Sequence, residues 1–122
     1  MKRAILAATV AALFAVPASA EMSVATFLMK TDALKAKGIL ALGSPDIGVL
    51  REEVKAATIK YRDTIKDAKA KGKKPHSCPP EKLKMNSDDL IAHFKTVPQN
   101  QAKRISVRAS FFDMMKKRYP CT

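Results

Sequence analysis

The chain contains only two cysteines, Cys78 and Cys121, and their chemical state limits every fold that the rest of the sequence permits. A bond between them closes a loop of about 44 residues, which stabilises a fold by roughly 4 kcal/mol in the chain-entropy model. Cysteines are usually oxidised in exported proteins and reduced in the cytosol. Whether the chain is exported therefore decides how the two cysteines are interpreted.

Residues 1–20 have the three parts of a secretory signal peptide. Lys2 and Arg3 form a basic start, Ala4–Val16 is an apolar run, and small residues precede the cleavage site. The apolar run is too short to span a bilayer, which takes about 20 residues. We therefore expect a signal peptide followed by one exported, periplasmic helical domain over residues 21–122.

Export favours a disulfide between Cys78 and Cys121. The alternative is a metal site made with His76 and His93, but the spacing of the four side chains matches no standard zinc arrangement. An oxidising compartment also favours the disulfide over thiolate ligands. The sequence therefore predicts one disulfide, no metal and no cofactor.

The net charge of the whole chain is +12, and without Lys2 and Arg3 it is +10. Most of that excess lies in residues 71–122, which carry twelve basic and four acidic side chains. Such a field attracts acidic proteins, anionic membranes or nucleic acid. Export argues against nucleic acid, and the basic stretch lacks the interleaved aromatic residues that stack on bases.

Periodic apolar residues predict an all-α domain of four helices. Ser23 and Ser44 are suitable N-caps, and Gly38 suits the end of the first helix. Ser87 is expected to cap the third helix, and Pro98 to stop it. The predicted helices cover residues of about 23–37, 45–71, 87–97 and 101–118. A short link, Ile39–Gly43, joins the first two, and Pro45 suits the first position of the second. The second helix carries an apolar stripe that is expected to face the core: Ile47, Leu50, Val54, Ala57, Tyr61, Ile65 and Ala68.

Residues 72–86 lack periodicity and are rich in proline, which predicts a long strap between the second and third helices. A connection of this length is often functional. The alternative is a crossover pinned in place by Cys78. A tight turn near residues 98–100 predicts that the third and fourth helices are antiparallel neighbours, so that the disulfide ties the strap to the last helix.

The predicted last helix is apolar around more than half of its circumference. Its polar stripe is narrow: Lys103, Ser106, Ser110, Asp113 and Lys117. A helix of this kind is either central to the fold or buries one side at a subunit interface. A homodimer through the last helix therefore stands beside the intramolecular interpretation.

The sequence offers little catalytic chemistry, and we expect no enzyme activity. His76 and Ser77 are adjacent, but neighbouring residues rarely point at each other productively. His93 is most simply an edge residue of its helix, with a pH switch as the alternative. Asp88 and Asp89 are explained by helix capping.

Basic side chains are the candidate partner-binding residues. Arg104 and Arg108 lie one turn apart on the apolar side of the predicted last helix. They are either anchors for an acidic partner or long side chains that cover apolar surface while reaching water. The strap adds Lys73, Lys74 and His76 to the candidates.

The C-terminal half resembles the Rap/Tai family of type VI secretion immunity proteins. The resemblance rests on a Cys-x-Pro segment at Cys78, the capped helix that starts at Asn86–Leu90, Val97–Pro98, and the closing Tyr119-Pro120-Cys121. Further cysteines and a Gly-Tyr-x-x-Gly motif that many relatives carry in the earlier helices are not seen here. The resemblance therefore carries over only the disulfide, and not the positions that contact an effector.

The resemblance implies a small, helical, often dimeric periplasmic protein that binds and inhibits a peptidoglycan amidase effector. The bottom-up features agree with a basic inhibitor that captures an acidic protein partner. Two alternatives come from other classes. One is an acid-stress chaperone of the Hde type, for which eleven acidic residues and two histidines are a weak trigger. The other is peripheral binding of an anionic membrane through Lys69, Lys71, Lys73 and Lys74.

Overall fold

The structure is a computed structural model that describes residues 21–122, so the expected signal peptide lies outside the described residues. Residues 21–122 form an all-α domain without strands, which confirms the predicted fold class. No helix in this part of the chain is long and apolar enough to cross a membrane. The elements are α1 (Val24–Lys37), the 3₁₀ helix η1 (Gly38–Gly43), α2 (Pro45–Ala70), α3 (Ser87–Lys95), α4 (Gln99–Ala102) and α5 (Val107–Arg118).

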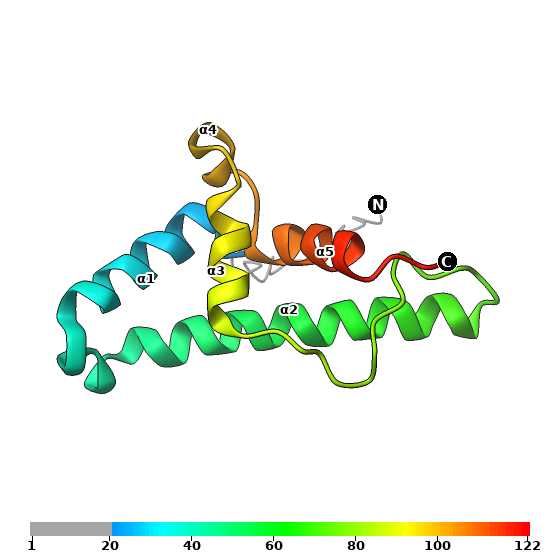
Figure 1. Cartoon of the computed structure of the whole chain (residues 1–122), viewed down its shortest axis with the longest axis horizontal. Coiled ribbons are helices and arrows are strands. Elements are labelled where there is room, and N and C mark those ends of the chain that lie inside the picture. The colour runs from blue at the N-terminus through cyan, green and yellow to red at the C-terminus, as the bar shows by residue number, and fades with distance from the viewer. Residues whose placement is uncertain (1–20) are drawn as a thin grey trace, which may run out of the picture.

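The longest element, α2, has 26 residues and is about 39 Å long. The other elements are arranged along it (Figure 1). At its N-terminal end, η1 makes a sharp corner with α1, so that α1 and α2 diverge from that corner. The short helix α3 stands steeply to α2 with its first turn beside it and packs on α1 and α5, while α5 lies beside the C-terminal half of α2. The strap, residues 72–86, returns from the end of α2 to the start of α3.

The predicted start signals of α1 and α2 are confirmed. The Ser23 side chain accepts a hydrogen bond from the N–H of Thr26, and the Ser44 side chain accepts one from a backbone N–H in the first turn of α2. Pro45 occupies the first position of α2, where a missing N–H costs nothing. Gly38 ends α1 with φ of +56°, a left-handed conformation that glycine adopts without a steric penalty.

The predicted N-cap of α3 was wrong by one residue. Asn86 caps the helix: its side-chain oxygen accepts from the N–H of Asp89 at 2.9 Å, and the Asp89 carboxylate accepts from the N–H of Asn86 at 3.2 Å. This reciprocal capping box satisfies two donors at once, which a cap at Ser87 does not. The helix also ends at Lys95, two residues before the predicted boundary.

The segment predicted as one helix over residues 101–118 forms two helices, α4 and α5. The chain between them pairs with the residues at the start of α1. The N–H of Val107 donates to the carbonyl of Met22, and the N–H of Val24 donates to the carbonyl of Ile105, both at 2.9 Å. A continuous helix would use the backbone groups of this link internally, so pairing with the N-terminal segment interrupts it.

Because of this interruption, α5 starts as a separate helix and runs in its own direction. Ser106 caps the helix by accepting from the N–H of Ala109 at 3.0 Å. The helix then runs beside α2 and meets α3 at a steep angle, so the two helices are in contact as predicted but are not antiparallel. Ser110, predicted on a polar stripe, is buried, because α5 contacts both α1 and α2 and its buried face is correspondingly wide.

One apolar core joins α1, α2, α3 and α5. Phe27 and Phe94 pack edge to face across α1 and α3 with ring centroids 5.1 Å apart. Tyr61 of α2 packs in the same way on Phe111 of α5 at 5.7 Å. The periodic stripe predicted on α2 supplies its buried residues. The core consists of Val24, Phe27, Leu50, Ala57, Tyr61, Ile65, Leu90, Phe94, Ala102, Val107, Phe111, Met114 and Met115.

Candidate functional site

The predicted disulfide is present. Cys78 and Cys121 are joined, with their Cα atoms 5.0 Å apart. The N–H of Cys78 also donates to the carbonyl of Tyr119 at 2.8 Å, so the strap is fastened to the chain beyond α5 at two points. Residues 21–122 contain no group of three or more His, Cys, Asp or Glu side chains that could hold a metal ion. The cysteines act as a structural clamp.

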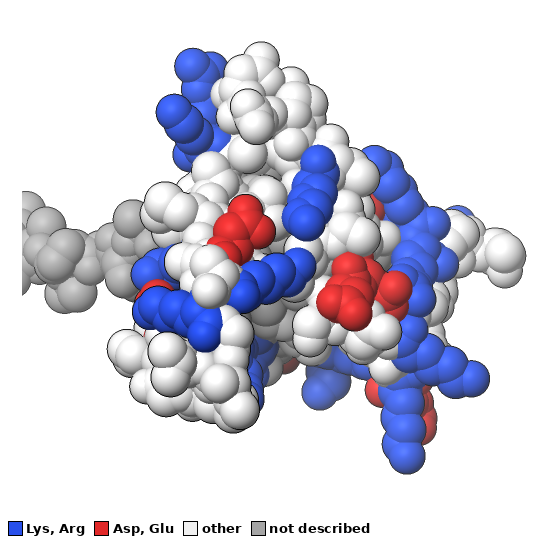
Figure 2. Space-filling model, turned by 60° about the vertical axis from the view of Figure 1, so that its left-hand side comes forward, with Lys and Arg blue, Asp and Glu red and all other residues white. Residues whose placement is uncertain are grey.

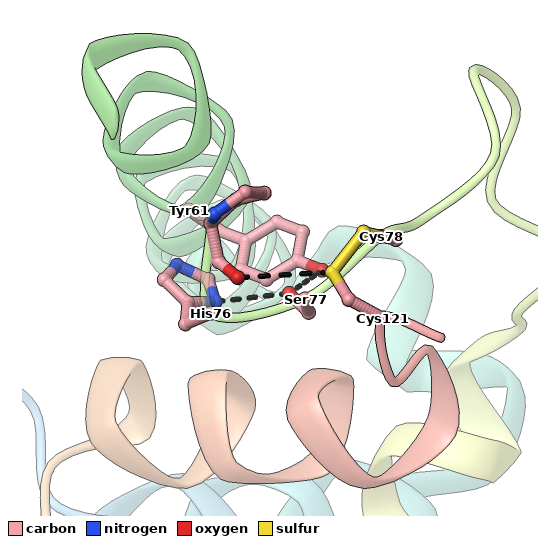
Figure 3. The surroundings of a disulfide bond; sticks show 6 residues. Tyr61, His76, Ser77, Cys78 and Cys121 are labelled. Carbon is pink, nitrogen blue, oxygen red and sulfur yellow. Dashed lines mark hydrogen bonds between the residues drawn. A yellow bond between two sulfur atoms is a disulfide. The ribbon is translucent and has the colours of Figure 1, made fainter. Parts of the chain in front are cut away.

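A buried polar cluster lies beside the disulfide (Figure 3). The Ser77 hydroxyl is 2.6 Å from the Tyr61 hydroxyl and 2.9 Å from Nδ1 of His76. Figure 3 shows the side chains of Tyr61 and His76 meeting at Ser77. Ser77 is 0% exposed, so no substrate reaches its hydroxyl. Burial also raises the pKa of Tyr61, against the opposing effect of the Ser77 hydrogen bond. The cluster therefore holds the strap against α2.

The imidazole of His76 lies between Tyr61 and Phe112. Its ring stacks on Phe112 with centroids 5.6 Å apart and lies 5.3 Å from the Tyr61 ring. Nε2 is buried and has no hydrogen-bond partner among residues 21–122. Burial, and then the charge of Lys116, lowers the pKa of His76 below its ordinary value. The folded protein therefore favours the neutral ring.

This burial of His76 predicts a pH dependence of stability. Because the pKa of His76 is lower in the folded protein than in the unfolded chain, the unfolded chain binds more protons as the pH falls below about 6.5. We expect the free energy of unfolding to decrease between pH 7 and pH 5. Urea unfolding followed by circular dichroism at several pH values measures this effect.

The matched variants are His76→Gln and His93→Gln, which remove the two histidines of the chain one at a time. His93 lies 4.0 Å from Asp113, whereas His76 stacks on Phe112 beside the buried polar cluster. His76→Gln should flatten the pH profile, and His93→Gln should leave the decrease assigned to His76 in place. Equal slopes in the wild-type protein and His76→Gln would show that His76 does not carry the effect.

A groove opens where α1 and α2 diverge, and α3 lines one side of it. Its volume is about 680 Å³, and its floor is apolar. The sequence stripe that forms the core continues into this groove, where it is only partly covered. The lining residues are Phe27 of α1, Ile47, Leu50, Arg51, Val54 and Lys55 of α2, Met85, Asn86, Ser87, Leu90 and Ile91.

The charged residues of the groove are both basic. Arg51 and Lys55 lie one helical turn apart on α2 and are exposed at the groove, and none of the lining residues within the described range 21–122 is acidic. Lys55 is 4.0 Å from a carboxylate oxygen of Glu52, a loose contact between exposed groups that contributes little. An apolar floor beside two cations suits a segment that combines apolar and acidic side chains.

The candidate residues of the strap lie at the other end of the molecule from the groove. Lys73 and Lys74 are exposed just beyond the C-terminal end of α2. His76 turns inward to the buried cluster, and its ring contacts Tyr61 and Phe112 instead of projecting to solvent. The two lysines are therefore accessible to a partner, whereas most of His76 is covered.

The two arginine candidates lie near the start of α5. Arg104 is exposed in the link before α5. Arg108 forms an ion pair with Glu21 at 2.7 Å, so part of its charge is already matched. The helix α5 is about 18 Å long and separates these arginines from Lys73 and Lys74. The five candidates therefore do not form one cluster.

Sequence reasoning missed the groove as a site. Ile47, Leu50 and Val54 were predicted as one apolar stripe of a core-facing helix, and a periodic pattern does not distinguish a covered residue from a groove floor. The long strap without periodicity was the one sequence feature that could have indicated a site here, because Met85 near its end lines the groove.

Comparison with protein-family models, with curated proteins and with solved structures gave no match for this chain. The candidate site therefore rests on the geometry of the chain itself.

Proposed function

We propose that the chain is a non-catalytic binding protein that holds an acidic, apolar segment of a partner protein in the groove between α1, α2 and α3. The groove is the observation that carries this proposal. Its volume is about 680 Å³, its apolar floor contains Ile47, Val54 and Leu90, and its rim has two basic side chains. Concave apolar sites with few polar groups are typical of binding sites.

The scaffold around the groove is built to change little on binding. The disulfide and the backbone pairing of the strap with Tyr119 fix the segment that leads to Met85 and α3. The capping box fixes the start of α3 itself. Preorganisation of this kind lowers the cost of ordering a site when a partner binds.

The more specific form of the proposal is an immunity protein of the periplasm, which binds a peptidoglycan amidase and blocks its action. Its support is the resemblance of residues 75–121 to the Rap/Tai family, together with a disulfide that joins the two ends of the resembling segment. The strong positive charge adds to this support, because electrostatic attraction speeds the capture of an acidic partner.

The test is co-purification of the tagged, exported protein from its own cells, with matched glutamate variants. Val54→Glu places a charge in the groove, whereas Ile59→Glu makes the same change on an exposed part of α2 outside it. We expect the wild-type protein and Ile59→Glu to retain one companion that Val54→Glu loses at least tenfold. Retention by all three forms would show that the groove is not the binding site.

The purified companion is then assayed for peptidoglycan hydrolysis with and without the chain. We expect the companion to be an amidase that stoichiometric amounts of the wild-type chain inhibit. A companion without peptidoglycan amidase activity contradicts the immunity role while leaving the binding role of the groove intact.

Charge reversal on the rim gives a separate prediction. Arg51→Glu/Lys55→Glu should weaken binding of the companion by roughly tenfold or more at low salt, and the difference should shrink as salt screens the charges. Lys60→Glu/Lys66→Glu is the matched control, because it changes the net charge equally on exposed positions of α2 outside the groove. Isothermal titration calorimetry in a salt series measures both. Equal losses in the two variants would indicate a general charge effect without a rim contact.

A further inference from the structure

The corner between α1 and α2 is an apolar tip, defined here as Gly38–Gly43. Its sequence, Gly-Ile-Leu-Ala-Leu-Gly, contains no polar side chain. Ile39 is 81% exposed, and Leu40 and Leu42 are each 79% exposed. Ala41 is the only buried residue of the tip. Three large aliphatic side chains are therefore presented to solvent within four consecutive residues.

The local backbone holds these side chains outward. Ile39 and Leu42 are three residues apart in a 3₁₀ helix, so they lie on the same side of it. The tip leaves α1 through the left-handed Gly38, and an ion pair of 3.1 Å between Lys30 and Asp46 joins α1 to the start of α2 behind it. The exposed aliphatic side chains are thus part of a fixed corner.

The fold does not explain why these side chains are apolar. None of the three belongs to the core or to the partly buried residues packed against it. Contiguous exposed apolar groups of this kind mark a surface that contacts another molecule or a membrane. The tip is distinct from the groove, since none of its residues lines the groove.

Basic side chains border the tip. Lys35 and Lys37 lie in the last turn of α1, are exposed, and form no ion pair within residues 21–122. The acidic neighbour on the other side, Asp46, is already paired with Lys30. Figure 2 brings this end of the molecule forward and shows a lobe of uncharged residues at the lower left with basic side chains along its upper edge.

The position and size of the tip indicate which kind of partner it can contact. It lies at one extremity of the longest axis of the molecule (Figure 1), so a flat surface can meet it before any other element interferes. A second copy of the chain is a poorer fit, because a stable dimer buries at least about 1,200 Å² and a six-residue corner offers much less. Two cations beside protruding aliphatic groups match an anionic lipid surface.

We propose that the apolar tip inserts into an anionic membrane surface, with Ile39, Leu40 and Leu42 among the acyl chains and Lys35 and Lys37 at the headgroups. Each aliphatic side chain raises the partition constant roughly tenfold on insertion. Three such groups with two lysines give reversible binding comparable to that of a single lipid anchor.

In the proposed orientation, the tip contacts the membrane and the basic C-terminal end of α2 points away from it. The exposed Lys69, Lys71, Lys73 and Lys74 lie at the opposite end of α2, which is about 39 Å long, several times the screening length of about 10 Å at 0.1 M salt. They add little to attraction at the tip. A chain bound through its tip therefore leaves its basic end free.

The test is co-sedimentation of the mature chain, residues 21–122, with two kinds of vesicle: phosphatidylethanolamine mixed with phosphatidylglycerol, and pure phosphatidylcholine. The tip variant is Leu40→Ser/Leu42→Ser. The matched control is Met29→Ser/Ile59→Ser, which removes two exposed apolar side chains elsewhere. We expect roughly a hundredfold weaker binding to the anionic vesicles for the tip variant and a change of less than twofold for the control.

Further measurements distinguish insertion of the tip from binding through the basic end and from dimer formation. Wild-type protein that fails to sediment with anionic vesicles, or equal losses in both serine variants, would overturn it. Loss of binding in a Lys69→Glu/Lys71→Glu/Lys73→Glu/Lys74→Glu variant, with the tip variant unaffected, would assign the membrane contact to the basic end and overturn it as well. A dimer in sedimentation velocity that only the tip variant abolishes, without vesicle binding, would assign the tip to a second copy of the chain. Because all of the substituted positions are exposed, circular dichroism should show unchanged folding.

Discussion

Replacing both cysteines, as Cys78→Ser/Cys121→Ser, is expected to lower the free energy of unfolding by about 4 kcal/mol. The bond joins residues 43 apart in the sequence, and its loss lets the unfolded chain explore many more conformations. For a domain of this size the loss is a large share of the total stability. Urea unfolding of residues 21–122 measures it, and the denaturant slope should increase because the unfolded state becomes more extended.

Reduction of the wild-type protein is the internal control for this prediction. A thiol reductant should move the wild-type unfolding midpoint to that of the double serine variant and should not move the variant. A wild-type midpoint that is insensitive to complete reduction would contradict the assigned role of the bond. Tryptic cleavage after Lys73, Lys82 or Lys84 should accelerate in parallel, because the bond fastens the strap that carries these lysines.

Local signals predicted most of the helical framework. Ser23, Ser44 and Pro45 began helices where expected because an N-cap acts on backbone groups only two or three residues away. The stripe of α2 predicted its buried residues because a helix places every third or fourth side chain on one face. Information of this kind is contained within a single turn or a single helix, so the sequence alone displays it.

The division between α4 and α5 depends on residues far apart in the sequence. The link before α5 forms backbone hydrogen bonds with the segment before α1, from Val107 to Met22 and from Val24 to Ile105. A local sequence pattern cannot indicate a partner so far away along the chain. The apolar periodicity continued through the link and favoured one helix. Tertiary pairing overrode that preference, and α5 packs mainly along α2 while still contacting α3.

The candidate site was predictable only in part. The disulfide followed from cysteine count and expected export, and the strap lysines are exposed as a charged, proline-rich segment suggests. The groove was not predictable, because Val54 and Leu90 have the same pattern whether a neighbouring helix covers them or diverges. The tip was also missed: Ile39–Gly43 looked like a short connection, and its exposure depends on the direction in which the corner faces.

Tyr61 is expected to be the most sensitive single position that connects the strap to the core. It is 0% exposed, and its ring contacts Phe111, Phe112 and the His76 imidazole. Tyr61→Ala should lower the free energy of unfolding by about 3–5 kcal/mol, because it leaves a cavity between α2, α5 and the strap. Tyr61→Phe retains the ring and removes one hydrogen bond to the buried Ser77, so its cost should be about 1 kcal/mol.

The two substitutions together separate packing from hydrogen bonding at this position. Tyr119→Phe is the matched control, since it removes the hydroxyl of the chain's other tyrosine, which is only partly buried, and should change stability by less than about 0.5 kcal/mol. Equal losses for Tyr61→Phe and Tyr61→Ala would assign the whole effect to the hydroxyl network and contradict the packing argument. Because the network also fixes His76, Tyr61→Phe should reduce the pH dependence of stability that His76 produces, which links the core of the bundle to the position of its strap.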